Sequence, residues 1–279
     1  MHLSRLDNEV IFKKAFTDKI VLTQFVKDVL GLKIKLGKIE TEKRFKPKMA
    51  YIDFSYDIFT ESTDERIIIE IQRVSYDYNF DRFLHYHNMA IAELQRNSKD
   101  YGIKTTVYTI VVLTASGTIE DKDGELIEED VLISNVNPHN RKGQTFNFYG
   151  HQLIFLNPNF KKVDTPPQLV DWFDLILESI NHPDKPKLNL KNRGVKRAVK
   201  LIEDDNLTPE ERRAAKVAAA TEETRKIVER RAKAEGQEEG RMNEKLATAH
   251  KMIAKGFDIE MISEMTGLDA ETLNQLDIN

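Results

Sequence analysis

One run of the sequence, TTVYTIVVLTA at residues 105–115, limits the possible folds more than any other feature. Nearly every position in it is apolar or β-branched, so a strand built from this run has no face that suits water. Strands of this kind lie at the centre of a sheet, where other elements cover both faces. We therefore predict a central strand over residues 105–115.

The segments on either side of this run alternate between helical and strand patterns. Apolar spacing predicts helices over residues 9–16, 20–30, 75–95 and 169–180, and strands over residues 51–59, 66–72 and 152–156. Asp7 is predicted to cap the first helix, and Lys122-Asp123-Gly124-Glu125 to turn a further hairpin. Helix, strands, helix and strands in this order favour an α/β core over a helical bundle or a sandwich.

The character of the sequence changes after Asn157, and the predicted helix at residues 169–180 leads into a connecting segment. Pro183 and Pro186 introduce a lysine-rich stretch, which predicts a connection on the surface. We therefore expect a first domain over residues 1–185 and a linker over residues 186–206.

The last part of the chain, residues 207–279, is expected to be a helical extension. Thr208-Pro209-Glu210-Glu211 combines a cap, a proline at the first helical position and a glutamate that completes a capping box. The long stretch that follows is mostly Ala, Glu, Lys and Arg, with weak points at Gly236 and Gly240. A helix-turn-helix-like end is predicted from three short apolar-patterned segments, residues 246–253, 259–265 and 270–276.

The composition excludes several classes of protein. The 279 residues contain no cysteine, which excludes thiol catalysis, zinc–thiolate sites and disulfides. The 42 Lys and Arg against 46 Asp and Glu give a net charge of -4, which argues against a strongly basic coat for nucleic acid. No apolar run approaches the ~20 residues of a membrane helix, and the N-terminus lacks the pattern of a signal peptide. We expect a cytoplasmic protein that does not enter a membrane.

Basic residues crowd one short segment near the N-terminus: Lys33, Lys35, Lys38, Lys43, Arg44, Lys46 and Lys48. Only Glu40 and Glu42 lie among them. Such a cluster is either a local track for nucleic acid or the edge of a sheet that lysines protect from aggregation. The sequence leaves both interpretations open.

Two short strands around a polar turn carry the residues that point to chemistry. If the hairpin closes through a two-residue turn at Thr63-Asp64, Asp57 faces Glu70 and Ser55 faces Gln72. One face of the hairpin is then aliphatic, and the other collects carboxylates at one end. A register slip of one residue would place Asp57 and Glu70 on opposite faces and remove the site.

The facing carboxylates of Asp57 and Glu70 predict a metal site. Two ionised carboxylates about 5 Å apart repel each other strongly unless a cation offsets their charge. Carboxylate and amide oxygens suit Mg²⁺ or Mn²⁺, ions that commonly contact phosphate oxygens. Such an ion polarises a phosphodiester and lowers the pKa of a bound water, which is the chemistry of phosphodiester hydrolysis. The spacing alone also fits exposed polar residues on a half-buried hairpin.

The strand pair Asp57…Glu70-Ile71-Gln72 follows the helical segment EVIFKKAF at residues 9–16 and precedes a helix that carries Arg82 and Tyr86. This combination resembles the Rpn (recombination-promoting nuclease) and transposase family of the PD-(D/E)XK nuclease superfamily. The tail, from Ala234 to Leu268, is similar to the Glu-Gly-rich helix and terminal helical motif of that family. The resemblance implies a restriction-endonuclease-like core, with a mixed sheet flanked by helices, and an all-α C-terminal extension.

The resemblance also implies roles for individual residues. Asp57 and Glu70 would bind the metal, Mg²⁺ or Mn²⁺, and Gln72 would occupy the place of the motif lysine. Because glutamine offers only a neutral amide, the general base stays open. Glu9 would match the acidic residue that the first helix sends into the site, or it is an exposed carboxylate at a helix start. Asp53, on the same strand face as Asp57, could stand in for it.

Three residues beyond the Glu70 strand would contact DNA by this resemblance: Arg73, Arg82 and Tyr86. Arg82 and Tyr86 lie one helical turn apart and would contact phosphate without reading the base sequence. A solvated helix face is the other interpretation. His85 and His87 are two residues apart on a helix and cannot both face one metal, so His87 is expected in the core.

Two functions are compatible with these features. The first is a Mg²⁺-dependent DNA endonuclease linked to recombination or mobile DNA. The second is a catalytically weak DNA-binding or assembly protein that has kept the nuclease fold. The C-terminal helices would read DNA or join copies in a homo-oligomer, and their few basic residues, among them Lys251 and Lys255, argue against direct reading.

Overall fold

The computed structural model describes residues 1–45, 54–72, 80–94, 102–115 and 119–277. The chain divides into two compact units, residues 1–219 and residues 220–279. The boundary lies inside one long helix, α6 (Pro209–Ile253). The first unit contains every described strand, and the part of the second unit that is described is helical.

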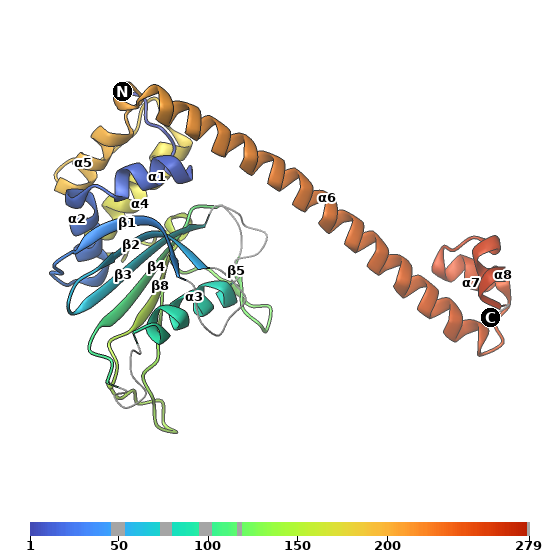
Figure 1. The fold of residues 1–279 in the computed structure, drawn as a ribbon. Helices are drawn as coiled ribbons and strands as arrows, with labels where there is room; N and C mark the ends of the chain where they lie inside the picture. The colour runs from blue at the N-terminus through green and yellow to red at the C-terminus, as the bar shows by residue number, and fades with distance from the viewer. Residues whose placement is uncertain (46–53, 73–79, 95–101, 116–118, 278–279) are drawn as a thin grey trace. The chain divides into compact units, whose positions relative to one another are not determined.

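A six-stranded mixed sheet forms the centre of the first unit (Figure 1), in the order β1-β2-β3-β4-β8-β7. Its strands are β1 (Lys38–Phe45), β2 (Phe54–Glu61), β3 (Glu65–Gln72), β4 (Thr106–Leu113), β7 (Val131–Asn135) and β8 (Gln152–Leu156). β4 pairs in parallel with both β3 and β8, and its residues from Val107 to Leu113 are buried. The predicted central strand is therefore confirmed.

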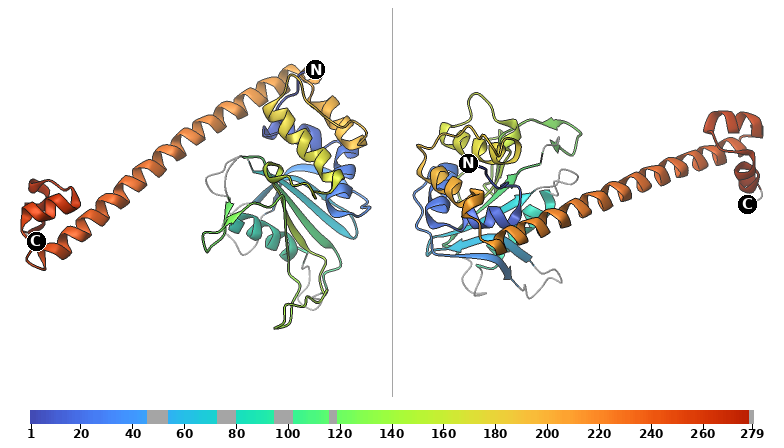
Figure 2. Two further views of the ribbon diagram at one scale, coloured as in Figure 1. Left: turned by 180° about the vertical axis from the view of Figure 1, so that it is seen from behind. Right: turned by 90° about the horizontal axis from the view of Figure 1, so that it is seen from above.

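Helices cover both faces of this sheet (Figures 1 and 2). One face carries α1 (Glu9–Phe16), α2 (Lys19–Leu30), α4 (Pro167–Asn181) and α5 (Arg193–Ile202). The other face carries α3 (Phe80–Ala92), whose buried Phe83 and Ala90 pack on the sheet. This arrangement confirms the predicted α/β fold with a mixed sheet flanked by helices.

Aromatic side chains join the helices of the first face. The Phe12 and Phe16 rings of α1 stack with centroids 4.2 Å apart, and Phe16 meets Phe25 of α2 edge to face at 4.9 Å. The ring of Trp172 on α4 lies 5.1 Å from that of Phe25. These contacts fix α1, and with it Glu9 and Lys13, against α2, which packs in turn on α4.

The structure differs from the predicted linker over residues 186–206. α5 occupies the middle of that range and buries Val195, Ala198 and Ile202 against the main core. Basic residues alternate with these apolar positions, so the composition of the segment hides an amphipathic helix. The boundary between the units, at residue 219, also lies beyond the predicted first domain at 1–185.

Smaller elements complete the first unit. They are the hairpin strands β5 (Ile119–Glu120) and β6 (Leu126–Ile127) and the 3₁₀ turns η1 (Pro158–Phe160) and η2 (Asp204–Asn206). The predicted turn of that hairpin is confirmed, since Gly124 adopts φ 84°, which glycine tolerates best. The cap of α1 is Asn8 and not the predicted Asp7, because the Asn8 side chain accepts a hydrogen bond from the Val10 N–H.

The basic segment near the N-terminus forms an edge of the sheet. In the described part of the chain β1 has one neighbour, β2, and it carries Lys38, Lys43 and Arg44. Lysines on an edge strand hinder pairing with a further strand, as the edge interpretation of this segment requires. Lys46 and Lys48 lie outside the described residues.

The second unit is built around the end of α6, with α7 (Ile259–Thr266) and α8 (Ala270–Asp277). A small core holds these helices together, formed by Ala249, Ile262, Leu268 and Leu273.

The predicted capping box at the start of α6 is confirmed, because Thr208 and Glu211 exchange hydrogen bonds of 2.9 and 3.2 Å. Among the described residues, no helix combines the length and the apolar character that crossing a membrane requires.

Candidate active site

The β2–β3 hairpin has the register that the sequence predicts. Ile58 pairs with Ile69, and the ladder continues to Glu61 opposite Arg66. The Ser62 N–H donates to the Glu65 carbonyl at 2.8 Å, which closes the predicted two-residue turn. The aliphatic face also forms as predicted, since Ile58, Ile67, Ile69 and Ile71 all enter the main core.

Asp57 and Glu70 lie where this ladder ends. The Asp57 N–H donates to Glu70 Oε1 at 3.1 Å, and the Ile71 N–H donates to Asp57 Oδ2 at 3.0 Å. Beyond the last described backbone pair of the ladder, each side-chain carboxylate thus accepts a hydrogen bond from a backbone N–H of the facing strand. The structure brings the two predicted acids together and fixes both at one end of the hairpin.

Burial makes the charge of both carboxylates costly. The Glu70 side chain is 2% exposed and that of Asp57 20%. Loss of water raises the pKa of Glu70 well above its ordinary value, and the neighbouring Asp57 charge raises it further. Burial also raises the pKa of Asp57, while the Ile71 N–H and the Lys13 ammonium oppose that rise. A cation at this position would offset the cost.

Lys13 of α1 connects the first helix to the hairpin. Its Nζ lies 3.6 Å from Asp57 Oδ1 and 3.2 Å from Glu42 Oε1, and it also contacts the Glu9 carboxylate. Glu9 is therefore linked to the site through Lys13. Lys13 is not among the residues predicted for the site, although its position four residues after Glu9 puts both side chains on one helix face.

Glu42 is a second residue that the sequence did not reveal. Among the described residues it is the only non-glycine with a positive φ, 50°, a conformation that costs about 1–3 kcal/mol. The β1–β2 pairs on either side of it place Glu42 opposite Asp57. No local pattern marks such a position, because the left-handed conformation depends on the neighbouring strand.

Gln72 follows Glu70 by two residues on β3, so strand alternation puts both side chains on one face. The residue is buried, and its carbonyl accepts hydrogen bonds from the Thr114 N–H at 2.9 Å and the Thr114 hydroxyl at 3.2 Å. Asp53 and Arg73, two further predicted site residues, lie outside the described residues.

Arg82 and Tyr86 lie on α3, which covers the face of the sheet opposite to that covered by α1. Arg82 Nη2 is 3.9 Å from Glu70 Oε2, and the Arg82 guanidinium lies 5.4 Å from the centre of the Tyr86 ring. The Arg82 side chain is 43% exposed, so it faces both the acid and the solvent. The next helical position, His87, is buried beside Thr109, as expected for a core histidine.

The donor set fits a hard divalent cation with few protein ligands. Among the described residues, no group of three or more His, Asp and Glu side chains is arranged to hold a metal ion. Mg²⁺ commonly binds through one or two carboxylates and fills its remaining positions with water and substrate phosphate. The buried pair Asp57 and Glu70, in which burial and mutual repulsion make the charged forms costly, is suited to that role.

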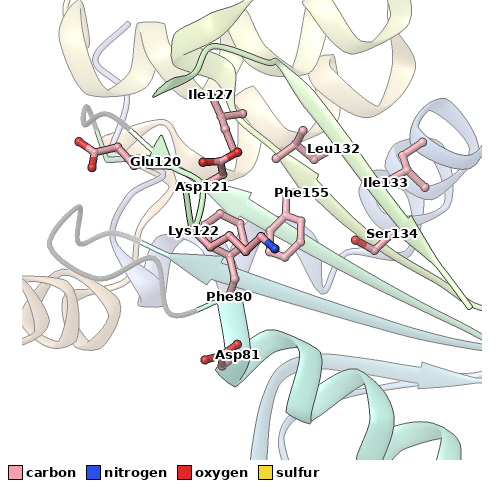
Figure 3. Close-up of a pocket in the computed structure, with 10 residues that line it drawn as sticks. All are labelled: Phe80, Asp81, Glu120, Asp121, Lys122, Ile127, Leu132, Ile133, Ser134 and Phe155. Carbon is pink, nitrogen blue, oxygen red and sulfur yellow. The ribbon is translucent and has the colours of Figure 1, made fainter. Parts of the chain in front are cut away.

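A cavity of about 770 Å³ lies beside the start of α3 (Figure 3). Its apolar lining comes from Phe80, Ile127, Leu132, Ile133 and Phe155, and its charged lining from Asp81, Glu120, Asp121 and Lys122. Three carboxylates against one ammonium repel phosphate, so this cavity does not suit a DNA backbone. None of the described residues that line it belongs to the predicted site.

Comparison with known families gives two matches. The PD-(D/E)XK nuclease family transposase matches residues 7–239, and the Rpn/YhgA-like nuclease family, C-terminal HTH domain, matches residues 243–277. The first range holds all the predicted site residues, and the second holds α7 and α8. No curated protein and no solved structure matches the chain. The two matches confirm the resemblance predicted from the motifs, including its extension into the tail.

Proposed function

We propose that this chain, which belongs to the PD-(D/E)XK nuclease family transposases, is a metal-dependent endonuclease that hydrolyses phosphodiester bonds of DNA. The observation that carries the proposal is the buried pair Asp57 and Glu70 at the end of the β2–β3 ladder. The family description also favours a role in recombination or mobile DNA.

Asp57 and Glu70 would hold Mg²⁺ or Mn²⁺. When bound, such an ion polarises the phosphodiester and lowers the pKa of a nearby water. The Ile71 N–H keeps the Asp57 carboxylate in place, and the Asp57 N–H does the same for Glu70. The Gln72 amide, on the same strand face as Glu70, would donate or accept a hydrogen bond to orient the attacking water.

Two parts of the chain would contact DNA. Arg82, which faces solvent beside Glu70, would pair with a backbone phosphate, with Tyr86 packed under its guanidinium. Arg73 would add a further contact. The helix-turn-helix domain of the second unit would bind the duplex independently of the active site.

Cleavage of supercoiled plasmid in Mg²⁺ or Mn²⁺ tests the proposal. We expect the full chain to nick or cut the plasmid, and Asp57→Ala and Glu70→Ala to lower the rate by at least about 10²-fold, because each removes a ligand of the ion. Glu125→Gln, on the exposed turn of the β5–β6 hairpin, serves as the control variant. Cutting by either site variant at the wild-type rate would refute the assignment.

A further inference from the structure

We propose that Lys13 of α1 takes the part of the missing motif lysine in this reaction, an inference that rests on the proposed function. The strand that carries Glu70 has a neutral glutamine, Gln72, at the motif position and so supplies no positive charge there. Lys13 brings an ammonium to the same carboxylates from another element, with its Nζ 3.6 Å from Asp57 Oδ1.

The Lys13 side chain is held in place before any substrate binds. It is only 13% exposed, and its ammonium contacts carboxylates from α1, β1 and β2, those of Glu9, Glu42 and Asp57. The stacked Phe12 and Phe16 rings anchor the helix that carries it. A fixed charge of this kind needs little reorganisation during the reaction, unlike a solvated lysine on the surface.

The balance of charge gives Lys13 a role that differs from that of a metal ligand. Among the described residues, the carboxyl groups of Glu9, Glu42, Asp57 and Glu70 lie at the site, and two cations, Lys13 and Arg82, contact them. Removal of the Lys13 charge leaves the cluster more negative. A divalent cation would then bind at least as tightly, whereas the phosphate, which is an anion, would be repelled.

In this proposal Lys13 is a positioning residue. It fixes the Asp57 carboxylate, and its positive charge lowers the net negative charge of the cluster that the phosphate approaches. A purely structural lysine would instead affect folding, or metal binding and cleavage together. Measurement of cleavage and metal binding on the same variant separates these cases.

The test uses the full chain with Lys13→Gln and Lys13→Arg. Lys14→Gln is a matched control, because Lys14 lies on the same helix but contacts Glu211 and the Asn206 carbonyl. Plasmid cleavage is measured at saturating Mn²⁺, Mn²⁺ binding by calorimetry, and folding by thermal melting. We expect Lys13→Gln to cleave about 10²-fold more slowly, as when one fixed donor to a developing charge is lost, and to bind Mn²⁺ at least as tightly as wild type.

Lys13→Arg keeps the charge and should recover most of the rate, while Lys14→Gln should cleave like wild type. Wild-type cleavage by Lys13→Gln would refute the role of Lys13 and leave the nuclease function standing. Weakened Mn²⁺ binding in Lys13→Gln, with cleavage restored by more Mn²⁺, would also refute it and make Lys13 an organiser of the metal site. Absence of any cleavage by the wild type would instead refute the proposed function itself.

Discussion

Glu70 carries an ionisable group at a position that water scarcely reaches, since its side chain is 2% exposed. Natural proteins place such groups where their chemistry is needed, because an apolar residue would be more stable there. The hydrogen bond from the Asp57 N–H recovers only part of the cost of burial, and the nearby Asp57 charge adds to it. Under the proposed function, activity and stability therefore oppose each other at this residue.

Replacement of Glu70 by glutamine tests that opposition. Because burial raises the pKa of Glu70, the folded chain keeps a proton that the unfolded chain has lost, and stability falls as pH rises above the ordinary glutamate value. We expect Glu70→Gln, measured without divalent cations, to raise the melting temperature at neutral pH by at least about 2 °C, the shift that about 1 kcal/mol produces in a domain of this size.

The increase in melting temperature should become smaller toward acidic pH, where both the folded and the unfolded wild type hold the proton. The same change at Glu125, which is exposed, should leave the melting temperature unaltered. A melting temperature that falls in Glu70→Gln would show that the carboxylate stabilises the fold, contrary to this account.

His87 gives the chain a pH dependence of the opposite sign. Its Nδ1 lies 2.9 Å from the Thr109 hydroxyl, and its Nε2 is buried with no hydrogen-bond partner among the described residues. Burial, with a smaller contribution from His151, lowers the pKa of His87 to about 4. The unfolded chain then takes up the proton first, so stability is lost as pH falls from about 6.5 toward 4.

Urea unfolding of His87→Gln at pH 7 and pH 4 measures this effect. A shift from about 6.5 to about 4 corresponds to about 3 kcal/mol, so the variant should lose about that much less stability on acidification than wild type does. His139→Gln, at an exposed position, is the control. Equal acid sensitivity in wild type and His87→Gln would mean that His87 is not buried in its neutral form.

At the scale of elements, α5 shows how closely the helices of the first face approach one another. A Cβ added to Gly194 would lie 2.6 Å from Gln24 Cβ and 2.8 Å from the Trp172 ring, so glycine is required for α5 to pack on α2 and α4. The Asn192 cap is tied to the same place, because its side chain donates to the buried Asp28 at 3.0 Å.

Gly194→Ala should therefore destabilise the first unit by about 1–3 kcal/mol, the usual cost of overpacking a core. Gly236→Ala is the comparison variant, and it should stabilise its helix by about 0.5–1 kcal/mol, because a Cβ there meets nothing within 4 Å and alanine favours a helix over glycine. Denaturant unfolding followed by the fluorescence of Trp172 reports on the first unit. An unchanged midpoint in Gly194→Ala would support a loosely packed segment, as expected for a linker.

At the scale of the whole molecule, the two units have different roles in the proposed function. The carboxylate pair lies in the first unit, and the helix-turn-helix match lies in the second. The start of α6 belongs to the first unit, where the Asn8 side chain donates to the Ala215 carbonyl at 2.9 Å and Lys14 pairs with Glu211. A cut after Ala219 keeps these contacts and removes only the second unit.

A chain that ends at Ala219 should melt like the first unit of the full chain and cleave DNA at a similar rate when DNA is saturating. Its affinity for DNA should fall by at least about 10-fold, because the chain loses one of two linked DNA-binding parts. Light scattering on both forms tests whether the tail also joins copies of the chain. Loss of cleavage at every DNA concentration would mean that the second unit takes part in catalysis.

Local pattern in the sequence determined much of this protein. The apolar run at residues 105–115 predicts the central strand, the turn at Thr63-Asp64 sets the register of Asp57 and Glu70, and the capping box at Thr208 begins α6. Each of these depends on residues that are near in sequence or paired through a short turn, so spacing and side-chain type are sufficient to specify it.

Packing between distant segments decided the rest. Only the tertiary structure brings Lys13 from α1 to Asp57 on β2, turns Glu42 into a left-handed conformation opposite that residue, and buries α5 in a stretch that reads as a linker. These features depend on how helices lie against a sheet, and the same local sequence is compatible with many such arrangements. The sequence therefore specified the pairing of Asp57 with Glu70, and the tertiary structure placed the Lys13 ammonium beside them.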